Sequence, residues 1–197
     1  MLLNIAFLSL FLTDFILLFI FSIDFAFSRH QSECSFLWVH MSDISQSFAL
    51  MPWFVTGFAD GEGTFVVSIF RSKTHSLGWT VLLIFEVSAA NNPANRQLLE
   101  SFRDFFGGGQ INSYRNQLYY RVQDLPTLLK VRDHFLKHPL QSTKLIYFQL
   151  WSQVLDLMVI KEHLVLEGLL RIIAIKSHFP RGLNSKLIAA FPNIPSI

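Results

Sequence analysis

The sequence predicts an α+β domain in which one antiparallel sheet carries helices on one face. Two observations point to this class. First, the sequence contains two pairs of strand-like segments with alternating residues, and the two segments of each pair follow each other closely in the chain. Second, helical segments precede, separate and follow these pairs. Strands joined by short turns form hairpins, and hairpins separated by a helix yield an antiparallel sheet. The expected order is therefore α-β-β-α-β-β-α.

Local signals give the expected bounds of each element. Pro52 is tolerated only in the first turn of the first helix. Asn92 caps the second helix, and Gly107 follows its end. Alternating apolar residues identify the strands, and His138-Pro139 ends the helix after them. We expect helices over residues 47–60, 93–106, 125–137, 145–165 and 169–176, and strands over residues 64–72, 79–89, 110–115 and 117–123.

Composition indicates a folded chain with a modest positive charge. Of 197 residues, 51% are hydrophobic and 15% are charged, which excludes extensive disorder because disorder requires low hydrophobicity and high charge. Cys34 is the only cysteine, so a disulfide scaffold and a cysteine-based zinc site are excluded. Residues 50–197 hold 15 Lys and Arg against 10 Asp and Glu, a balance that suits a polyanionic partner.

The N-terminal segment differs from the rest of the chain. Residues 1–28 contain 21 apolar residues and no Lys or Arg, unlike a secretory signal with a basic start or an Arg-rich transit peptide. A membrane span would place Asp14 near its centre at a cost of about 2.5–3.5 kcal/mol. A membrane anchor, a poorly folded leader and in-frame upstream coding sequence, with Met41 as a second start, all stay open. We interpret residues 29–46 as a linker and 47–197 as the folded domain.

One face of the predicted sheet is apolar and packs on helices, whereas the other carries polar and aromatic side chains. Such a face can read base edges in a DNA groove, and an ordinary solvent-facing sheet is the alternative. Leu82 and Ile84 on the same face are less polar than a DNA-reading surface should be. The candidate DNA-binding residues are Ser68, Phe70, Ser72, Thr80, Glu86, Ser88, Gln110, Asn112, Tyr114, Tyr119, Arg121 and Gln123.

The segment from Trp53 to Gly63 carries the strongest signal. Trp53, Gly57 and Gly61 recur every four residues and so share one helix face. Glycine inside a helix costs about 1 kcal/mol relative to alanine, so a packing reason is indicated, and small residues at this spacing let two helices approach closely. Glu62 lies at the negative end of the helix dipole, where a bound cation or a nearby Lys or Arg would stabilise it. A solvated carboxylate is the alternative.

Residues 55–63 read Val-Thr-Gly-Phe-Ala-Asp-Gly-Glu-Gly, which resembles the nonapeptide motif of the LAGLIDADG homing endonucleases position by position. The similarity covers residues 47–194 and includes residues 138–144, His-Pro-Leu-Gln-Ser-Thr-Lys. The α-β-β-α-β-β-α order matches the fold of that family. The resemblance implies a sheet shaped as a saddle over DNA, with its helices on the opposite face.

The resemblance also implies roles for individual residues. Glu62 matches the metal-binding carboxylate of the family, with the Gly61 carbonyl as second protein ligand and Mg²⁺, or Mn²⁺ in its place, as the metal that polarises the phosphate. Lys144 aligns with a basic residue beside the scissile phosphate and would stabilise transition-state charge. Asp60 is interpreted as structural. Relatives carry a polar active-site residue where this chain has Ala89 and Ala90.

Only one copy of the motif is present, and family members with one copy are homodimers. The implied dimer interface comprises Trp53, Gly57, Asp60 and Gly61. The implied function is a sequence-specific, metal-dependent double-strand DNA endonuclease, encoded in an organellar intron of a mitochondrion or chloroplast. It would hydrolyse one phosphodiester in each strand of a pseudo-palindromic target. The alternatives are an intron RNA maturase on the same fold, and a catalytically decayed DNA-binding or membrane-anchored module.

Overall fold

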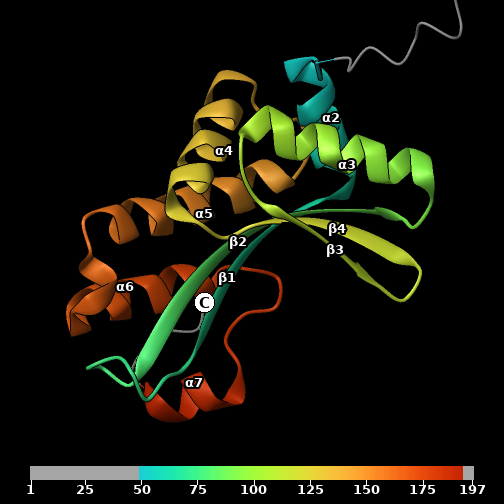
Figure 1. Ribbon diagram of the computed structural model, residues 1–197. Coiled ribbons are helices and arrows are strands. Elements are labelled where there is room, and N and C mark those ends of the chain that lie inside the picture. Colours follow the sequence, from blue (N-terminus) through green and yellow to red (C-terminus); the bar gives the residue numbers. More distant parts are fainter. Residues whose placement is uncertain (1–48, 193–197) are drawn as a thin grey trace, which may run out of the picture. The chain divides into compact units, whose positions relative to one another are not determined.

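The computed structural model describes residues 49–192, in which four antiparallel strands form one sheet in the order β1-β2-β4-β3 (Figure 1). The strands are β1 (Gly63–Arg71), β2 (Trp79–Ala90), β3 (Gln110–Tyr114) and β4 (Gln117–Val122). The helices are α2 (Pro52–Glu62), α3 (Pro93–Phe106), α4 (Leu125–Lys137), α5 (Lys144–Val159), α6 (Leu166–Ser177) and α7 (Ser185–Ala190), with the short 3-10 helix η1 (Glu162–Leu164). The α+β class and the α-β-β-α-β-β-α order predicted from the sequence are confirmed.

The helix starts follow from proline and side-chain capping. The sequence predicts a first helix from residue 47, but α2 begins at Pro52, after Met51 in extended conformation. This is the expected position, because a residue before proline avoids helical backbone angles. The side chain of Asn92 accepts a hydrogen bond from the backbone N–H of Asn95 at 2.8 Å, which caps α3 as predicted. Gly107 ends α3 in the left-handed region at φ 67°, where glycine carries no steric cost.

The predicted long helix over residues 145–165 is wrong. In its place α5 ends at Val159, and the chain turns at Lys161, whose φ of 62° lies in the left-handed region. After η1, α6 starts at Leu166, three residues before the predicted start. Gly168 permits this tight return, because a Cβ there would lie 2.1 Å from the carbonyl oxygen of Glu162. Apolar periodicity continues through the break, so the pattern alone did not reveal it. The tail also contains α7, a helix that was not expected from the sequence.

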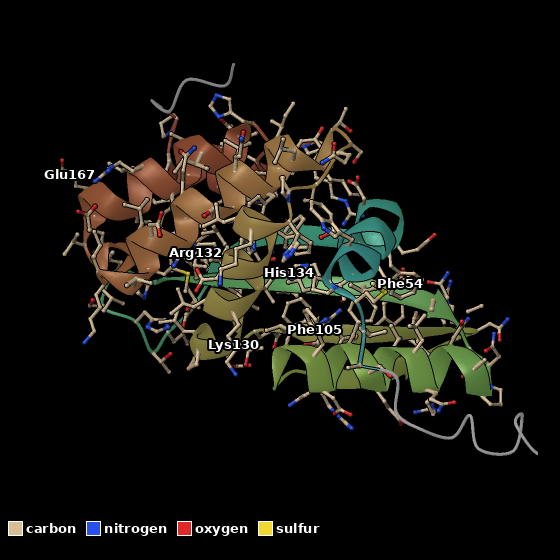
Figure 2. The ribbon with its side chains drawn as sticks, turned by 90° about the horizontal axis from the view of Figure 1, so that it is seen from above. Phe54, Phe105, Lys130, Arg132, His134 and Glu167 are labelled. Carbon is tan, nitrogen blue, oxygen red and sulfur yellow. The ribbon has the colours of Figure 1, made fainter. Side chains whose placement is uncertain are left out.

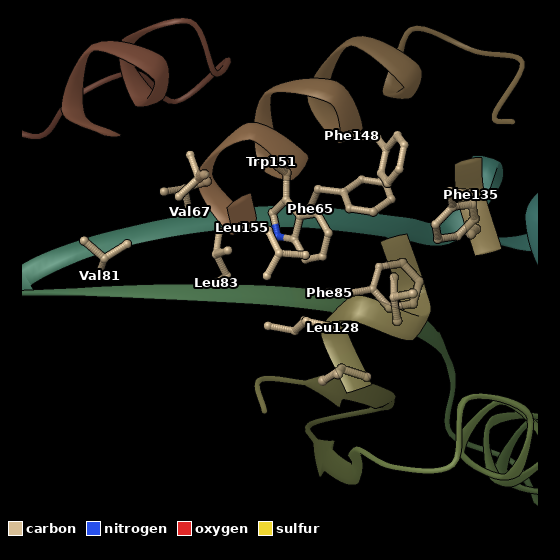
Figure 3. Close-up of a cluster of buried hydrophobic side chains, with 14 of the residues drawn as sticks. Phe65, Val67, Val81, Leu83, Phe85, Leu128, Phe135, Phe148, Trp151 and Leu155 are labelled. Carbon is tan, nitrogen blue, oxygen red and sulfur yellow. The ribbon is translucent and has the colours of Figure 1, made fainter. Parts of the chain in front are cut away.

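The core lies between one face of the sheet and the helices (Figure 3). Phe65 of β1 pairs with Phe85 of β2 in the strand register, and their rings lie 5.3 Å apart. Phe65 also contacts Phe135 of α4 and Trp151 of α5 at ring distances of 5.6 and 5.5 Å. Buried and less buried residues alternate along both long strands, so the sheet presents its other face, here called the open face, without helices packed on it.

The predictions for residues 1–28 and 29–46 concern segments outside the described residues. Among residues 49–192, no helix combines the length and the apolar character that crossing a membrane requires.

Candidate active site and open sheet face

Helix α2 separates a buried side from an exposed side. Val55, Thr56 and Ala59 are buried against the domain, whereas the Trp53 side chain is 58% exposed. A Cβ atom built on Gly57 or Gly61 would meet no other atom within 4 Å. Of the predicted interface residues, Gly57 and Gly61 therefore face open space and leave this side of the helix flat. The Trp53 ring, although mostly exposed, contacts the ring of His138 at a centroid distance of 5.0 Å.

Asp60 ties the end of α2 to the loop before α5. Its carboxylate accepts hydrogen bonds from the backbone N–H groups of Gln141 and Ser142 at 2.9 and 3.0 Å, and from the Ser142 hydroxyl at 2.5 Å. Partial burial opposes ionisation, but these hydrogen bonds and the nearby Lys144 hold the pKa of the Asp60 carboxyl below its usual value. Its contacts are thus within the chain, although the sequence analysis placed it among the interface residues.

Lys144, the first residue of α5, reaches the last turn of α2. Its ammonium nitrogen donates to the Gly61 carbonyl oxygen at 2.6 Å and to the Ala59 carbonyl oxygen at 3.3 Å. Partial burial lowers the pKa of Lys144, while the carboxylates of Asp60 and Glu62 act in the opposite direction. A cation at the carbonyl end of a helix is electrostatically favourable. This contact therefore joins the segment 55–63 to the segment 138–144.

Glu62 ends α2 one residue before β1. Its carboxylate is exposed, and no hydrogen bond or ion pair joins it to another residue within 49–192. Gly63, the next residue, is required by packing, because a Cβ there would lie 2.5 Å from the Ala59 carbonyl oxygen. No group of three or more His, Cys, Asp or Glu residues in the described part of the chain is arranged to hold a metal ion. One chain therefore offers a single free carboxylate at this position.

The open face divides into a polar half and an apolar half. On the polar half, the Arg121 Nε donates to the Glu86 carboxylate at 2.6 Å, and Gln110 lies beside Arg121 in the register. The Tyr119 hydroxyl donates to Gln117 at 2.8 Å, and Tyr119 lies between Ser88 and Asn112.

The apolar half lies on β1 and β2. Val66 pairs with Ile84, Ser68 with Leu82, and Phe70 with Thr80. Phe70 is 48% exposed, and the other apolar members, Val66, Leu82 and Ile84, are half-buried. We name Val66, Leu82, Ile84 and Phe70 the apolar block.

Ten of the twelve predicted DNA-binding residues lie on strands and on the open face, by strand register and burial. Ser72 and Gln123 do not, because each lies one residue beyond the end of its strand. The Ser72 hydroxyl is 2.9 Å from the Thr74 hydroxyl in the turn after β1. The ten residues are Ser68, Phe70, Thr80, Glu86, Ser88, Gln110, Asn112, Tyr114, Tyr119 and Arg121.

A buried histidine of α4, His134, packs against α2. The His134 Nε2 lies 3.1 Å from the Thr56 hydroxyl, which also donates to the His138 carbonyl oxygen at 3.0 Å. Burial, with a smaller contribution from His138, lowers the pKa of His134 to about 4. Figure 2 shows His134 on α4 beside α2 and close to Phe105. His134 and His138 share one face of α4 because they lie four residues apart, but this spacing does not predict the contact with Thr56.

Similar proteins combine this fold with this motif. The profile of the LAGLIDADG endonuclease family matches residues 55–155. "Probable intron-encoded endonuclease 2" of Neurospora crassa is 33% identical over 150 residues, which is 74% of this chain and 32% of that protein.

Two solved structures are also similar. I-SmaMI, described as a LAGLIDADG homing endonuclease bound to cleaved DNA, is 38% identical with a TM-score of 0.70 over 75% of this chain and 49% of that chain. The homing endonuclease I-TnaI is 32% identical with a TM-score of 0.68 over 75% of this chain and 100% of that chain.

The lengths of these proteins differ. The chain spans about a third of the curated relative and about half of I-SmaMI, but all of I-TnaI is matched. The family profile covers most of α2, the whole sheet and most of α5. This chain therefore belongs to the LAGLIDADG endonuclease family.

Proposed function

We propose that this chain is a sequence-specific, divalent-metal-dependent DNA endonuclease of the homing type that acts as a homodimer. The observation that carries the proposal is the arrangement at the end of α2. The free carboxylate of Glu62 follows the Gly61 carbonyl, which the Lys144 ammonium contacts at 2.6 Å. Carboxylate, carbonyl and ammonium groups together suit the charge that develops on a phosphodiester during hydrolysis.

A second copy of the chain would complete the site. The exposed side of α2 carries Trp53 and two glycines with open space around them, which suits close packing of two such helices. Packing along this surface would bring two Glu62 carboxylates together, one from each protomer. A two-fold dimer presents the same surface twice, so its DNA target would be pseudo-palindromic. The half-length match to I-SmaMI and the full-length match to I-TnaI support this arrangement.

The donor atoms at this position fit a hard divalent cation. Mg²⁺ is bound in proteins through one or two carboxylates, carbonyl oxygens, water and substrate phosphate, and Glu62 and Gly61 supply the first two kinds of oxygen. Two neighbouring carboxylates also repel each other unless a cation lies between them. Bound Mg²⁺, or Mn²⁺ in its place, would polarise the phosphate and lower the pKa of attacking water.

The other two residues of the site would have different roles, because Asp60 would position Lys144 and Lys144 would stabilise charge on the phosphate. Asp60 fixes the 141–142 loop through three hydrogen bonds, and this loop sets the start of α5 and hence the position of Lys144. Lys144 would stabilise negative charge on the phosphate oxygens during cleavage. Asp60 is therefore a positioning residue, whereas Glu62 and Lys144 would contact the metal or the reacting phosphate.

The open face would read the target sequence. The Glu86 carboxylate orients the Arg121 guanidinium, and an arginine held in place can donate two hydrogen bonds to guanine in the major groove. Gln110, Asn112 and Tyr119 extend this polar half across β3 and β4. The apolar block suits the C5 methyl groups of thymine, which are the apolar feature of the major groove. The relative named as intron-encoded supports an intron as the location of the gene, and we propose an organelle as its compartment.

Cleavage of a defined DNA tests the proposal. The full chain is incubated with an intron-free copy of the host gene in Mg²⁺ or in EDTA, next to the Glu62→Gln variant. We expect one double-strand cut in Mg²⁺, no cut in EDTA and no cut by the variant, which should still bind the DNA. Normal cutting by Glu62→Gln would refute the site. Selective binding of intron RNA without DNA cleavage would point to a splicing role instead.

A further inference from the structure

A cleft opens beside the candidate active site, between the edge strand β1 and the helices α5 and α6. Its volume is about 330 Å³. Among the described strands, β1 pairs only with β2, so it forms an edge of the sheet. The cleft starts at Gly63, next to Glu62, and includes Lys144, so it is continuous with the site described above. Its lining residues are Gly63, Thr64, Phe65, Val66, Val67, Thr143, Lys144, Tyr147, Lys176, Phe179, Pro180 and Arg181.

The charged residues of the cleft are all cationic. Lys144, Lys176 and Arg181 line it, and none of its lining residues is an Asp or Glu. No ion pair within residues 49–192 involves any of the three. The α5 helix also starts at the cleft wall, and its N-terminus adds partial positive charge. Lys176 and Arg181 repel one another, so an anion in the cleft would lower their electrostatic energy.

Two of the three cations, Lys144 and Lys176, are held in position by hydrogen bonds to backbone carbonyl oxygens. The half-buried Lys176 donates to the Val67 carbonyl oxygen of the β1 edge at 2.7 Å, which leaves two N–H donors on its ammonium group. Burial, with a contribution from Arg181, lowers the pKa of Lys176, consistent with two cations close together.

The turn that carries Arg181 is fixed on both sides. Gly182 adopts φ 51° and donates its N–H to Phe179 at 2.7 Å. The Phe179 ring stacks on Tyr147 at 6.0 Å. The exposed Arg181 side chain therefore projects from an ordered turn.

We propose that this cleft binds a backbone phosphate of DNA next to the one that is cleaved, with Arg181 and Lys176 as its donors. The inference rests on the proposed DNA-cleaving function and adds a contact outside the sheet face. A phosphate fits the site chemically, because guanidinium and ammonium groups donate charge-assisted hydrogen bonds to its oxygens. The contact would carry no base preference, and it would fix the register of the duplex over Glu62 and Lys144.

The salt dependence of DNA binding tests the proposal without knowledge of the target. Binding of the full chain to a labelled random-sequence duplex is measured against salt concentration for the wild type and for Arg181→Gln, Arg181→Lys and Lys130→Gln. Each lost phosphate contact lowers the slope of log affinity against log salt by about 0.9. Because the proposed homodimer would lose one contact per protomer, we expect the slope to fall by about 1.8 for Arg181→Gln, with near-complete recovery in Arg181→Lys and an unchanged slope for Lys130→Gln. The last variant removes an equal charge on α4.

Two outcomes separate this proposal from the function on which it rests. If the wild type fails to bind DNA, the proposed function falls and the phosphate contact falls with it. If the wild type binds and folded Arg181→Gln keeps the wild-type slope, only the phosphate contact is overturned.

A neutral-backbone scan adds a second readout. Single backbone phosphates of the target are replaced one at a time by methylphosphonate. At one position per half-site, this replacement should weaken DNA binding by the wild type but leave binding by Arg181→Gln unchanged. Equal sensitivity of both proteins at every phosphate would contradict the assignment.

Discussion

The Lys144 ammonium and the Gly61 carbonyl lie 2.6 Å apart, although 83 positions separate the two residues in the chain. This contact joins the start of α5 to the end of α2. It depends on the loop at Ser142, which Asp60 holds through its carboxylate. The site is therefore built by two segments that only the fold brings together.

Replacing Lys144 with methionine should separate catalysis from binding. Methionine keeps much of the side-chain length but removes the charge that would stabilise the transition state. We expect cleavage to slow by about 10²- to 10³-fold, while DNA affinity changes only a few-fold. Single-turnover cleavage and equilibrium binding of the same duplex measure the two quantities. Lys137→Met, on α4, is the control and should cleave at the wild-type rate. Normal cleavage by Lys144→Met would remove this residue from the chemistry.

Substitutions at Gly57 should affect assembly and folding in opposite directions. The site has open space in the single chain, so Gly57→Ala should raise the stability of an isolated protomer by about 1 kcal/mol through helix propensity. Gly57→Leu should block close approach of two α2 helices and yield a monomer by light scattering. A Gly57→Leu protein that remains a dimer of wild-type affinity would place the interface elsewhere.

Gly63→Ala is the matched control for that experiment. Its Cβ would lie 2.5 Å from the Ala59 carbonyl oxygen, so the end of α2 must shift to accommodate it. We expect a lower free energy of unfolding in this variant, measured by urea denaturation at a concentration where the wild type is monomeric. The contrast between the two glycines distinguishes a surface kept free for a partner from one filled by the chain itself.

The sequence predicted the fold and the site to different extents. Alternation along β1 and β2 predicted one apolar face that packs on helices, and Phe65 and Phe85 lie on that face, because burial of one sheet face leaves a period of two. Asn92 marked the start of α3, since capping acts through local backbone chemistry, whereas the start of α2 was predicted at residue 47, five residues before its actual start at Pro52. The break at Lys161 was missed, because one left-handed residue interrupts a helix without changing the apolar pattern.

The site was harder to derive because its contacts are non-local. The motif singled out Glu62 and Gly61, and resemblance alone singled out Lys144. No spacing rule predicts that Ser142 would bind Asp60 or that His134 would lie under Thr56. Arg181 was also missed, because neither a motif nor an apolar periodicity surrounds this single arginine in a tail that contains Pro and Gly. Its position becomes meaningful only when β1, α5 and α6 are placed around one cleft.

The apolar block should make the protein sensitive to thymine methyl groups. Replacing thymine with deoxyuridine removes one methyl and leaves the base pair intact. Burial of one such group contributes about 0.8 kcal/mol, so each contacted thymine should change affinity about fourfold. The measurement is binding to a selected target in which thymines are replaced one at a time. Ile84→Ala should abolish the sensitivity at its position, whereas Tyr119→Phe should leave it intact. Equal affinity for all deoxyuridine duplexes would mean that the apolar block does not contact thymine methyl groups.

Buried His134 should make the domain less stable in acid. Its folded-state pKa is about 4 against 6.5 for the free side chain, so the unfolded chain binds an extra proton between these values. Stability therefore rises with pH across this window and is lost as pH falls through it. The side chain is 8% exposed, and the full effect approaches about 3 kcal/mol.

Urea unfolding at a series of pH values between 7 and 4 measures this loss, with His134→Gln as the comparison. Glutamine can still pair with the Thr56 hydroxyl but does not titrate, so its unfolding free energy should fall less steeply over the same range. His138 lies 5.0 Å from His134 between ring centres and makes the smaller contribution to the lowered pKa of His134. A His138→Gln variant should therefore lessen the slope only slightly. If His134→Gln and the wild type lose stability in parallel, the acid sensitivity arises from carboxylates such as Asp60, whose ionised form the fold stabilises.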